Sequence, residues 1–416
     1  MQFLTVLFLF LILSEVVTRL WLARRQIRYV LSHRQQVPTE FRGKIGLHSH
    51  QRAADYTADR TRLTMLEVVF DATILLALTL GGGLQWIAEQ SRIVLGQGMG
   101  SEVMMVGIVV LLLGALHLPV TVYRQFVLEA RYGFNRMTPK LFIADTIKGI
   151  VIAALLGIPV LVIILWLMQS AGHTWWIWAW LVWASFNLLI MLIFPTWIAP
   201  LFNKFTPLQD QGLQARIEAL ARRCNFSIQG LFVMDGSKRS AHGNAYFTGF
   251  GKSRRIVFFD TLLSKLSAQE IEAVLAHELG HFKHHHIIKR IVLSLTTALV
   301  FFAALGWLAN QSWFYSGLGV NTPLTTSIGA IALLLFFMVV PVFTFWLTPV
   351  MNWLSRKDEF EADRFAAQQS DADQLVSALV KLFDDNAATL TPDPLHSAFY
   401  DTHPPAAIRI RHLAHS

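Results

Sequence analysis

The sequence predicts an all-α polytopic membrane protein with seven transmembrane helices and two segments exposed to water. Hydrophobic residues make up 54% of the chain and charged residues only 15%, and the mean hydropathy is positive. Soluble domains carry about 25% charged residues, so this composition indicates a membrane protein. Several windows also reach the roughly 20 apolar residues that a helix needs to cross a bilayer.

Seven spans follow from these windows. The first has no basic residue before its apolar run and no small-residue cleavage site after it, so we expect a retained anchor rather than a secretory signal. The spans are expected near residues 3–20, 65–88, 103–123, 145–168, 175–196, 287–308 and 325–350.

The positions of Lys and Arg predict the orientation of the spans. Runs of these residues follow the first and third spans, whereas the connectors 169–174 and 310–326 contain no charged residue. Cytoplasmic loops retain positive charge, so we expect the N-terminus outside and the C-terminus in the cytoplasm. The single Cys224 fits a reducing compartment.

We divide the chain into four segments on this basis. Residues 1–196 hold the first five spans, and residues 287–350 hold the last two. Residues 197–286 and 351–416 are expected to share the cytoplasm, so their side chains can contribute to one site.

The net charge of +8 does not indicate a nucleic-acid-binding protein. The excess is spread over the predicted cytoplasmic loops, where it sets topology and meets anionic lipid headgroups. We expect the lipid bilayer as a partner and no nucleic acid, and the sequence predicts no particular oligomeric state.

The first cytoplasmic segment has the periodicity of an α+β domain. Residues 213–226 have helical spacing, and "GLFVMD" (230–235) and "RRIVFFD" (254–260) are typical of short strands. Ser267 and Glu270 then form a capping box, which predicts the start of a helix. Within that helix a buried stripe is expected at Ile271, Val274, Leu275 and Leu279.

The sequence "HELGH" (277–281) on this helix predicts a metal site. His277 and His281 are four residues apart, about 40° around the axis, so both imidazoles can reach one ion. Glu278 can then take a proton from a metal-bound water, while zinc polarises a peptide carbonyl. The five-letter pattern alone also arises by chance. The capped helix favours a real site, and we expect Gly280 to leave room beside the metal.

A catalytic zinc needs a third protein ligand, and "SRKDEFEADRFA" (355–366) offers acidic residues. Glu359 and Asp363 share a helical face, while Glu361 points nearly opposite. We expect Glu359 as the third ligand and Asp363 as acceptor from the N–H of a ligating histidine. The alternative is a solvated acidic face.

The histidines after this motif have a simpler interpretation. His284, His285 and His286 lie where the helix ends and the sixth span begins. Polar or cationic groups suit a helix C-terminus and a membrane interface. We therefore expect an interfacial role for all three and no part in metal binding.

Charged residues within the spans predict a hydrated interior. Such residues usually face protein or water, because exposure to lipid costs several kcal/mol. Clustering at one depth favours a cavity that opens toward the cytoplasm, and snorkelling to the interface is the alternative. These residues are Glu15, Arg19, Glu67, Asp71, Asp145 and Lys148.

Together these motifs resemble those of the integral-membrane CAAX prenyl proteases, which are zinc metallopeptidases of the gluzincin type. The resemblance also covers "RYGFNRMTP" (131–139), "PTWIAPLFNKFTPL" (195–208), "SKRSAHGNAYFTGFGKSRRIVFFDTLL" (237–263) and "HPPAAIRIRHL" (403–413), and thus most of the chain.

This resemblance implies seven helices around an intramembrane chamber, with a cytoplasmic gluzincin-like α+β zinc peptidase domain facing it. It implies that an edge strand pairs with the substrate backbone. It further implies that His403 and Arg409 lie near the substrate carbonyl. The strand residues are Asn244, Ala245, Tyr246, Phe247, Thr248 and Gly249.

We therefore expect a zinc metalloendopeptidase that acts on peptide or protein substrates, with one zinc ion per chain. Removal of C-terminal residues from prenylated peptides is the activity that the resemblance implies. Two alternatives stay open: a quality-control peptidase that resembles the heat-shock membrane metalloproteases, and a metal transporter or sensor. The sequence does not distinguish a lipidated substrate from an unlipidated one.

Overall fold

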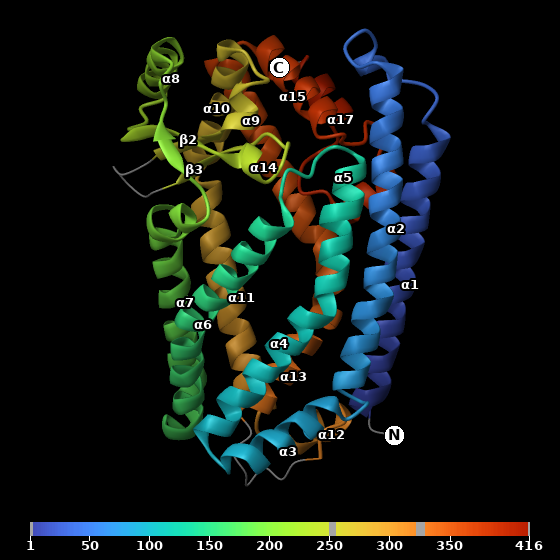
Figure 1. Ribbon diagram of the computed structural model, residues 1–416, viewed down its shortest axis with the longest axis vertical. Coiled ribbons are helices and arrows are strands. Elements are labelled where there is room, and N and C mark those ends of the chain that lie inside the picture. The colour runs from blue at the N-terminus through green and yellow to red at the C-terminus, as the bar shows by residue number, and fades with distance from the viewer. Residues whose placement is uncertain (1–2, 249–254, 322–328, 415–416) are drawn as a thin grey trace.

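The computed structural model describes residues 3–248, 255–321 and 329–414 and is mostly helical (Figure 1). The N-terminus and the C-terminus lie at opposite ends of the molecule. The long helices, which run along the length of the molecule, are α1 (Phe3–Ser32), α2 (Leu47–Leu78), α4 (Met99–Tyr123), α6 (Pro139–Ser170), α7 (Trp175–Ile193), α11 (His286–Leu308), α13 (Gly329–Thr344) and α14 (Thr348–Gln369).

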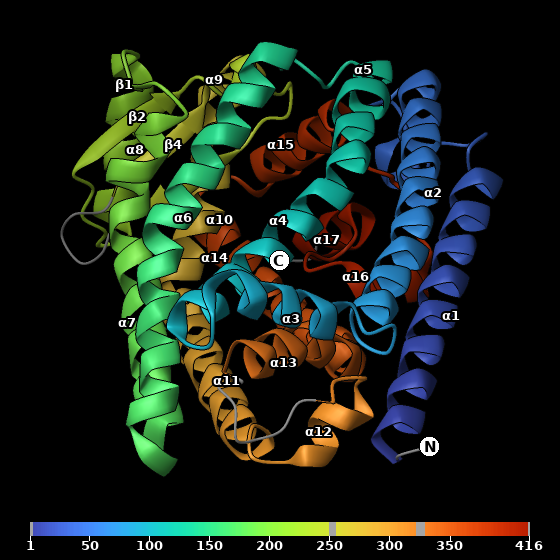
Figure 2. The same cartoon turned by 60° about the horizontal axis from the view of Figure 1, so that its bottom comes forward.

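Among the described residues, six helical stretches are long and apolar enough to cross a membrane, or seven if α2 and the shorter α3 (Gly83–Leu95) form one broken span. This confirms the predicted multi-pass helical fold. Short helices α5 (Glu129–Arg131) and α12 (Ser312–Gly317) follow α4 and α11. Figure 2 shows α3 across the end of the bundle that carries the N-terminus.

The second predicted span, 65–88, is wrong as a continuous helix. α2 ends at Leu78, and α3 begins at Gly83 after a bend of 52°. Three consecutive glycines cause the break: Gly82 has a φ of 77°, and a Cβ on Gly81 would lie 2.6 Å from the carbonyl oxygen of Ala77. The start of the predicted seventh span, 325–328, lies outside the described residues.

Most of these helices expose their apolar side chains, whereas α13 is enclosed. In the most apolar 18-residue segment of the spans that contain α1, α7 and α11, only 11% of the residues are buried. In the span formed by α13 and α14 the share is 50%. α13 therefore occupies the interior of the bundle, and the outer helices present the surface that meets lipid.

The water-exposed part combines a small sheet with helices. The strands are β1 (Phe205–Pro207), β2 (Gly230–Met234), β3 (Ala245–Thr248) and β4 (Arg255–Phe259), in the order β1-β2-β4-β3. β2 and β4 are parallel, and β3 runs antiparallel to β4 at one edge. The helices are α8 (Gln211–Arg223), α9 (Asp260–Leu263), α10 (Ala268–Lys283), α15 (Ala372–Asp385), α16 (Pro394–Tyr400) and α17 (Ala406–Leu413).

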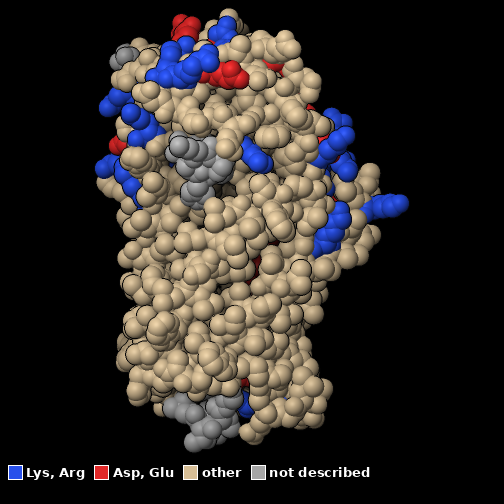
Figure 3. Space-filling model, turned by 90° about the vertical axis from the view of Figure 1, so that its left-hand side faces the viewer, with Lys and Arg blue, Asp and Glu red and all other residues tan. Residues whose placement is uncertain are grey.

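Charge separates this end of the molecule from the rest. On the face shown in Figure 3, Lys and Arg side chains gather at the end that carries the C-terminus, and few charges interrupt the long surface below. The pattern matches a bundle embedded in lipid with one basic, water-exposed end.

Two adjoining cavities, each partly open to the outside, lie in the molecule. One, of about 1190 Å³, extends from His403 to helices α1 and α2, and the other, of about 280 Å³, lies among α1, α2, α4 and α13. Both are lined by Arg19 and Val68. Hollow space therefore runs from the water-exposed domain into the bundle.

Charged residues of the spans line the smaller cavity or have polar partners elsewhere in the chain. Glu15, Arg19 and Asp71 line the smaller cavity. Glu15 pairs with Arg19, and Asp71 pairs with His117. The remaining contacts of such residues are Glu67 with Arg124, Asp145 with Arg239, and Lys148 with the carbonyl of Leu201. A polar interior thus accounts for Glu15, Arg19 and Asp71, whereas the exposed Lys148 fits snorkelling equally well.

Candidate metal centre

Helix α10 presents two histidines on one face because its start and its packing are fixed. Ser267 accepts from the backbone N–H of Glu270, and Glu270 accepts from that of Ser267, which is the predicted capping box. The buried stripe packs against the domain core through Ile271, Leu275 and Leu279. With the helix held in this way, the side chains of His277 and His281 lie one turn apart on the side that faces α14.

Helix α14 approaches α10 closely at Gly280. A Cβ at this position would lie 2.9 Å from the Cα of Ala362 and 3.1 Å from its carbonyl oxygen. Gly280 therefore lets two helices touch, and the expectation that it leaves room beside a metal is wrong. The contact sets the distance between the histidines of α10 and Glu359 of α14.

Gly280→Ala is expected to push α14 away from α10, because backbone atoms meet the new methyl group. Overpacking of this kind costs about 1–3 kcal/mol, and we expect weaker metal binding as well. Thermal unfolding and metal titration of the purified variant test this. Gly157→Ala, at a helical glycine with no atom within 4 Å of the added Cβ, is the matched control. Unchanged stability and metal affinity in Gly280→Ala would contradict the packing argument.

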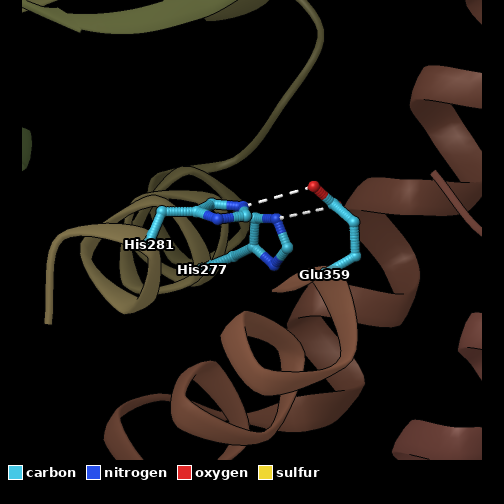
Figure 4. A group of neighbouring side chains, drawn as sticks. All are labelled: His277, His281 and Glu359. Atoms are coloured by element: carbon cyan, nitrogen blue, oxygen red, sulfur yellow. Dashed lines mark ion pairs between the residues drawn. The ribbon is translucent and has the colours of Figure 1, made fainter. Parts of the chain in front are cut away.

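His277, His281 and Glu359 converge with their ligand atoms within 4.8 Å of one another (Figure 4). Nε2 of His277 lies 3.4 Å from Oε2 of Glu359, and Nε2 of His281 lies 3.4 Å from Oε1. These distances are long for hydrogen bonds. They are close to the ligand-to-ligand distance of about 3.3 Å in a tetrahedral site around one zinc ion.

The state of Glu359 also fits a metal ion. Its side chain is 3% exposed, and its Oε2 is buried without a hydrogen-bond partner among the described residues. A buried carboxylate oxygen without a partner is costly. A cation between this oxygen and the two imidazoles satisfies it.

Asp363 and Arg409 contact Nδ1 of His277, the ring nitrogen that does not face Glu359. Oδ1 of Asp363 lies 2.8 Å from Nδ1 of His277, as the helical spacing predicts. Arg409 donates to both Asp363 oxygens, from Nε at 2.9 Å and from Nη2 at 2.5 Å, and its Nη1 lies 3.8 Å from Oε2 of Glu359. A proton on Nδ1 of His277 leaves the lone pair of Nε2 free for a metal.

These contacts also govern the protonation of His277 and Arg409. Burial alone lowers the pKa of His277, but its contacts with Asp363 and then Glu359 outweigh burial and raise it. Burial likewise opposes the charge of Arg409, and the ion pair with Asp363 raises its pKa. Arg409 therefore stays cationic beside the site, and at His277 a proton competes with a metal.

His403 lies between Glu359 and the larger cavity, and Glu278 follows the predicted ligand His277 in the chain. Nε2 of His403 lies 3.4 Å from Oε1 of Glu359, and the His403 side chain is 63% exposed and lines the larger cavity. Glu278 is half-buried, and within the described parts of the chain no hydrogen bond or ion pair engages its carboxylate. His403 can therefore reach a molecule in the cavity, and the carboxylate of Glu278 is left without a partner among the described residues, next to the predicted ligand His277.

The predicted substrate strand lies beside this site as β3. Phe247 of β3 contacts Phe282, the residue after His281, with ring centroids 5.2 Å apart. Asn244, just before β3, lines the larger cavity with His403. β3 forms the edge of the sheet, and its role in substrate binding stays a prediction. Gly249, at the end of that predicted stretch, lies outside the described residues.

The expectation for the three following histidines is wrong for His286. His285 is exposed and His284 partly so, as expected at a helix end. His286 is only 1% exposed, and its Nδ1 lies 2.9 Å from Nδ1 of His281. Helix α10 ends at Lys283, and His285 has a φ of 59°. The resulting turn directs His286 inward, and the sequence carried no signal for it beyond the histidine itself.

Known proteins share both parts of this architecture. Residues 26–204 match the family described as "CAAX prenyl protease N-terminal, five membrane helices", and residues 207–416 match "Peptidase family M48". The CAAX prenyl protease 1 homolog of Oryza sativa is 35% identical over 91% of this chain and 90% of its own length. The human CAAX prenyl protease 1 homolog is 31% identical over 94% and 91%. The crystal structure of S. mikatae Ste24p superposes with a TM-score of 0.91, at 29% identity over 99% of both chains.

The protein is a bundle of membrane helices, and its water-exposed end brings together His277, His281 and Glu359, with Glu278 beside them. This combination is that of a membrane-embedded metallopeptidase. The second half of the chain, which holds the metal centre and the last two spans, matches throughout, and residues 26–204 match as well. The chain belongs to peptidase family M48.

Proposed function

We propose that this metallopeptidase uses zinc to remove C-terminal residues from prenylated proteins. The observation that carries the proposal is similarity over most of the chain to proteins named CAAX prenyl proteases. The cavity of about 1190 Å³ that extends from His403 into the bundle supports it. A peptide tail and an attached lipid need both polar and apolar walls, and a C-a-a-X tail carries its lipid on the cysteine.

His277, His281 and Glu359 would hold the zinc. Two imidazoles and one carboxylate are the donor set of zinc peptidases, and a fourth position stays open for water or substrate. When bound, zinc acidifies a water molecule and polarises the scissile carbonyl.

The side chains around the ion have separate roles in this proposal. Glu278 takes the proton of the attacking water and passes it to the leaving amine. His403 donates to the carbonyl oxygen as negative charge develops there. Arg409 would assist through Nη1, the end of its guanidinium that faces Glu359, because Nε and Nη2 donate to Asp363. Asp363 keeps the proton of His277 on Nδ1. Residues 244–249 bind the substrate backbone by strand addition.

We also propose the orientation and segment boundaries expected from the sequence. The basic end that carries the metal centre faces the cytoplasm, and the N-terminus lies outside. Residues 197–286 and 351–416 then form one cytoplasmic domain, supported by residues 1–196 and 287–350 in the bilayer.

The purified protein is expected to cleave a farnesylated C-a-a-X peptide and to lose that activity when zinc is chelated. Burial of the lipid favours binding, so kcat/KM for the unlipidated peptide should be at least about tenfold lower. A protein stalled during translocation across a membrane tests the quality-control alternative in parallel. Equal kcat/KM for both peptides would reject lipid recognition, and cleavage that survives chelation would reject the metal mechanism.

A further inference from the structure

The imidazole of His286 is buried between a predicted metal ligand and two acidic residues of α14. Its Nδ1 lies 2.9 Å from Nδ1 of His281. Its Nε2 lies 3.1 Å from Oε2 of Glu361 and 3.5 Å from Oδ1 of Asp358. Both ring nitrogens therefore have polar partners in an otherwise closed environment.

The break between α10 and α11 makes the first of these contacts. Residues five apart on a continuous helix point about 140° away from each other, so their side chains do not meet. Here the left-handed residue His285 turns the chain after α10, and His286 returns to the side of His281. The two rings meet edge to face with centroids 5.1 Å apart.

Metal binding by His281 determines which ring nitrogen of His281 and of His286 carries a proton. Nε2 of His281 faces Glu359, so in a metal centre it carries the lone pair that binds the ion. The proton of His281 then lies on Nδ1 and is donated to Nδ1 of His286. His286 must carry its own proton on Nε2, where the carboxylate of Glu361 accepts it and that of Asp358 adds a second negative charge nearby.

We propose that His286 is a positioning residue of the metal centre: it holds His281 in the tautomer and ring orientation that bind the ion, and Glu361 and Asp358 hold His286. The proposal rests on the metal centre proposed above. Partners of this kind raise the basicity of a ligating imidazole and fix its direction. Each ligating histidine would then have its own support, Asp363 for His277 and His286 for His281.

A merely structural role for His286 makes a different prediction. In that case the residue joins α10, α11 and α14, and its loss lowers the stability of the metal-free protein without a separate effect on metal affinity. The two roles are therefore distinguished by two measurements on the same variants: the zinc dissociation constant by competition with a chromophoric chelator, and thermal unfolding of the zinc-free protein. Neither depends on peptidase activity.

His286→Leu is expected to weaken zinc binding by about 10–100-fold. His286→Asn should recover most of this loss, because its amide oxygen can take the place of Nδ1 and accept from His281. The absorption spectrum of the cobalt-loaded protein should change in His286→Leu and stay close to the parent in His286→Asn. His285→Asn is the matched control, since asparagine tolerates a left-handed backbone and the residue is exposed.

Parental zinc affinity in His286→Leu overturns the proposal, and so does an equal loss in His286→Asn. If zinc-free His286→Leu unfolds at a much lower temperature, its loss of zinc affinity does not distinguish the two roles. The double variant Asp358→Asn, Glu361→Gln then distinguishes them, because both side chains are partly exposed and their replacement disturbs the fold less. The proposal predicts a few-fold loss of zinc affinity in this double variant, and parental affinity overturns the proposal. If the parent protein binds no zinc at all, the metal centre itself fails, which is a separate outcome.

Discussion

Glu278→Gln is expected to bind one zinc ion per chain and to cleave peptide about 10²–10⁴-fold more slowly than the parent, the range typical of a lost general base. Glu278 is half-buried beside the site and is not among the three convergent ligand residues. The amide has nearly the same shape as the carboxylate but cannot accept the proton of the attacking water. Metal analysis and single-turnover cleavage of one peptide measure the two properties separately.

Glu359→Gln is the matched control for this experiment, because it makes the same chemical change on a predicted ligand. Its zinc affinity should fall together with its activity, whereas in Glu278→Gln only the activity falls. Parental turnover by zinc-loaded Glu278→Gln would remove Glu278 from the mechanism. Loss of zinc from that variant would instead make it a ligand.

Local periodicity explains why so much of the site could be predicted. The capping box fixes where α10 starts, so the four-residue spacing of His277 and His281 becomes one face of a helix. The same period on α14 separates Glu359 and Asp363 from Glu361. Residues that act within one regular helix can be derived from their spacing alone.

Features that depend on contacts between elements could not be predicted in this way. The role of Gly280 depends on the backbone of Ala362, some 80 residues later in the chain. The inward position of His286 depends on the left-handed turn at His285, and a non-glycine residue rarely adopts that conformation. The break after α2 was signalled by consecutive glycines, but the apolar character of residues 65–88 masked it.

Removal of Arg409 is expected to destabilise the protein more than any other single change at this site. The side chains of Arg409 and Asp363 are 6% and 0% exposed, and the guanidinium donates to both carboxylate oxygens. Arg409→Met leaves the carboxylate buried and without its cation, which costs about 3–5 kcal/mol. The free energy of unfolding of the zinc-free protein in detergent measures this cost.

The double variant Asp363→Asn, Arg409→Met separates an unpaired charge from lost packing. Asparagine can still accept the N–H of His277, and no charge is left buried, so a large part of the stability lost in Arg409→Met should return. Asp363→Asn alone completes the cycle. If the double variant is as unstable as the sum of the single changes, the two residues act independently. Arg409 would then contribute to stability through packing alone, and its ion pair with Asp363 would have no net effect on stability.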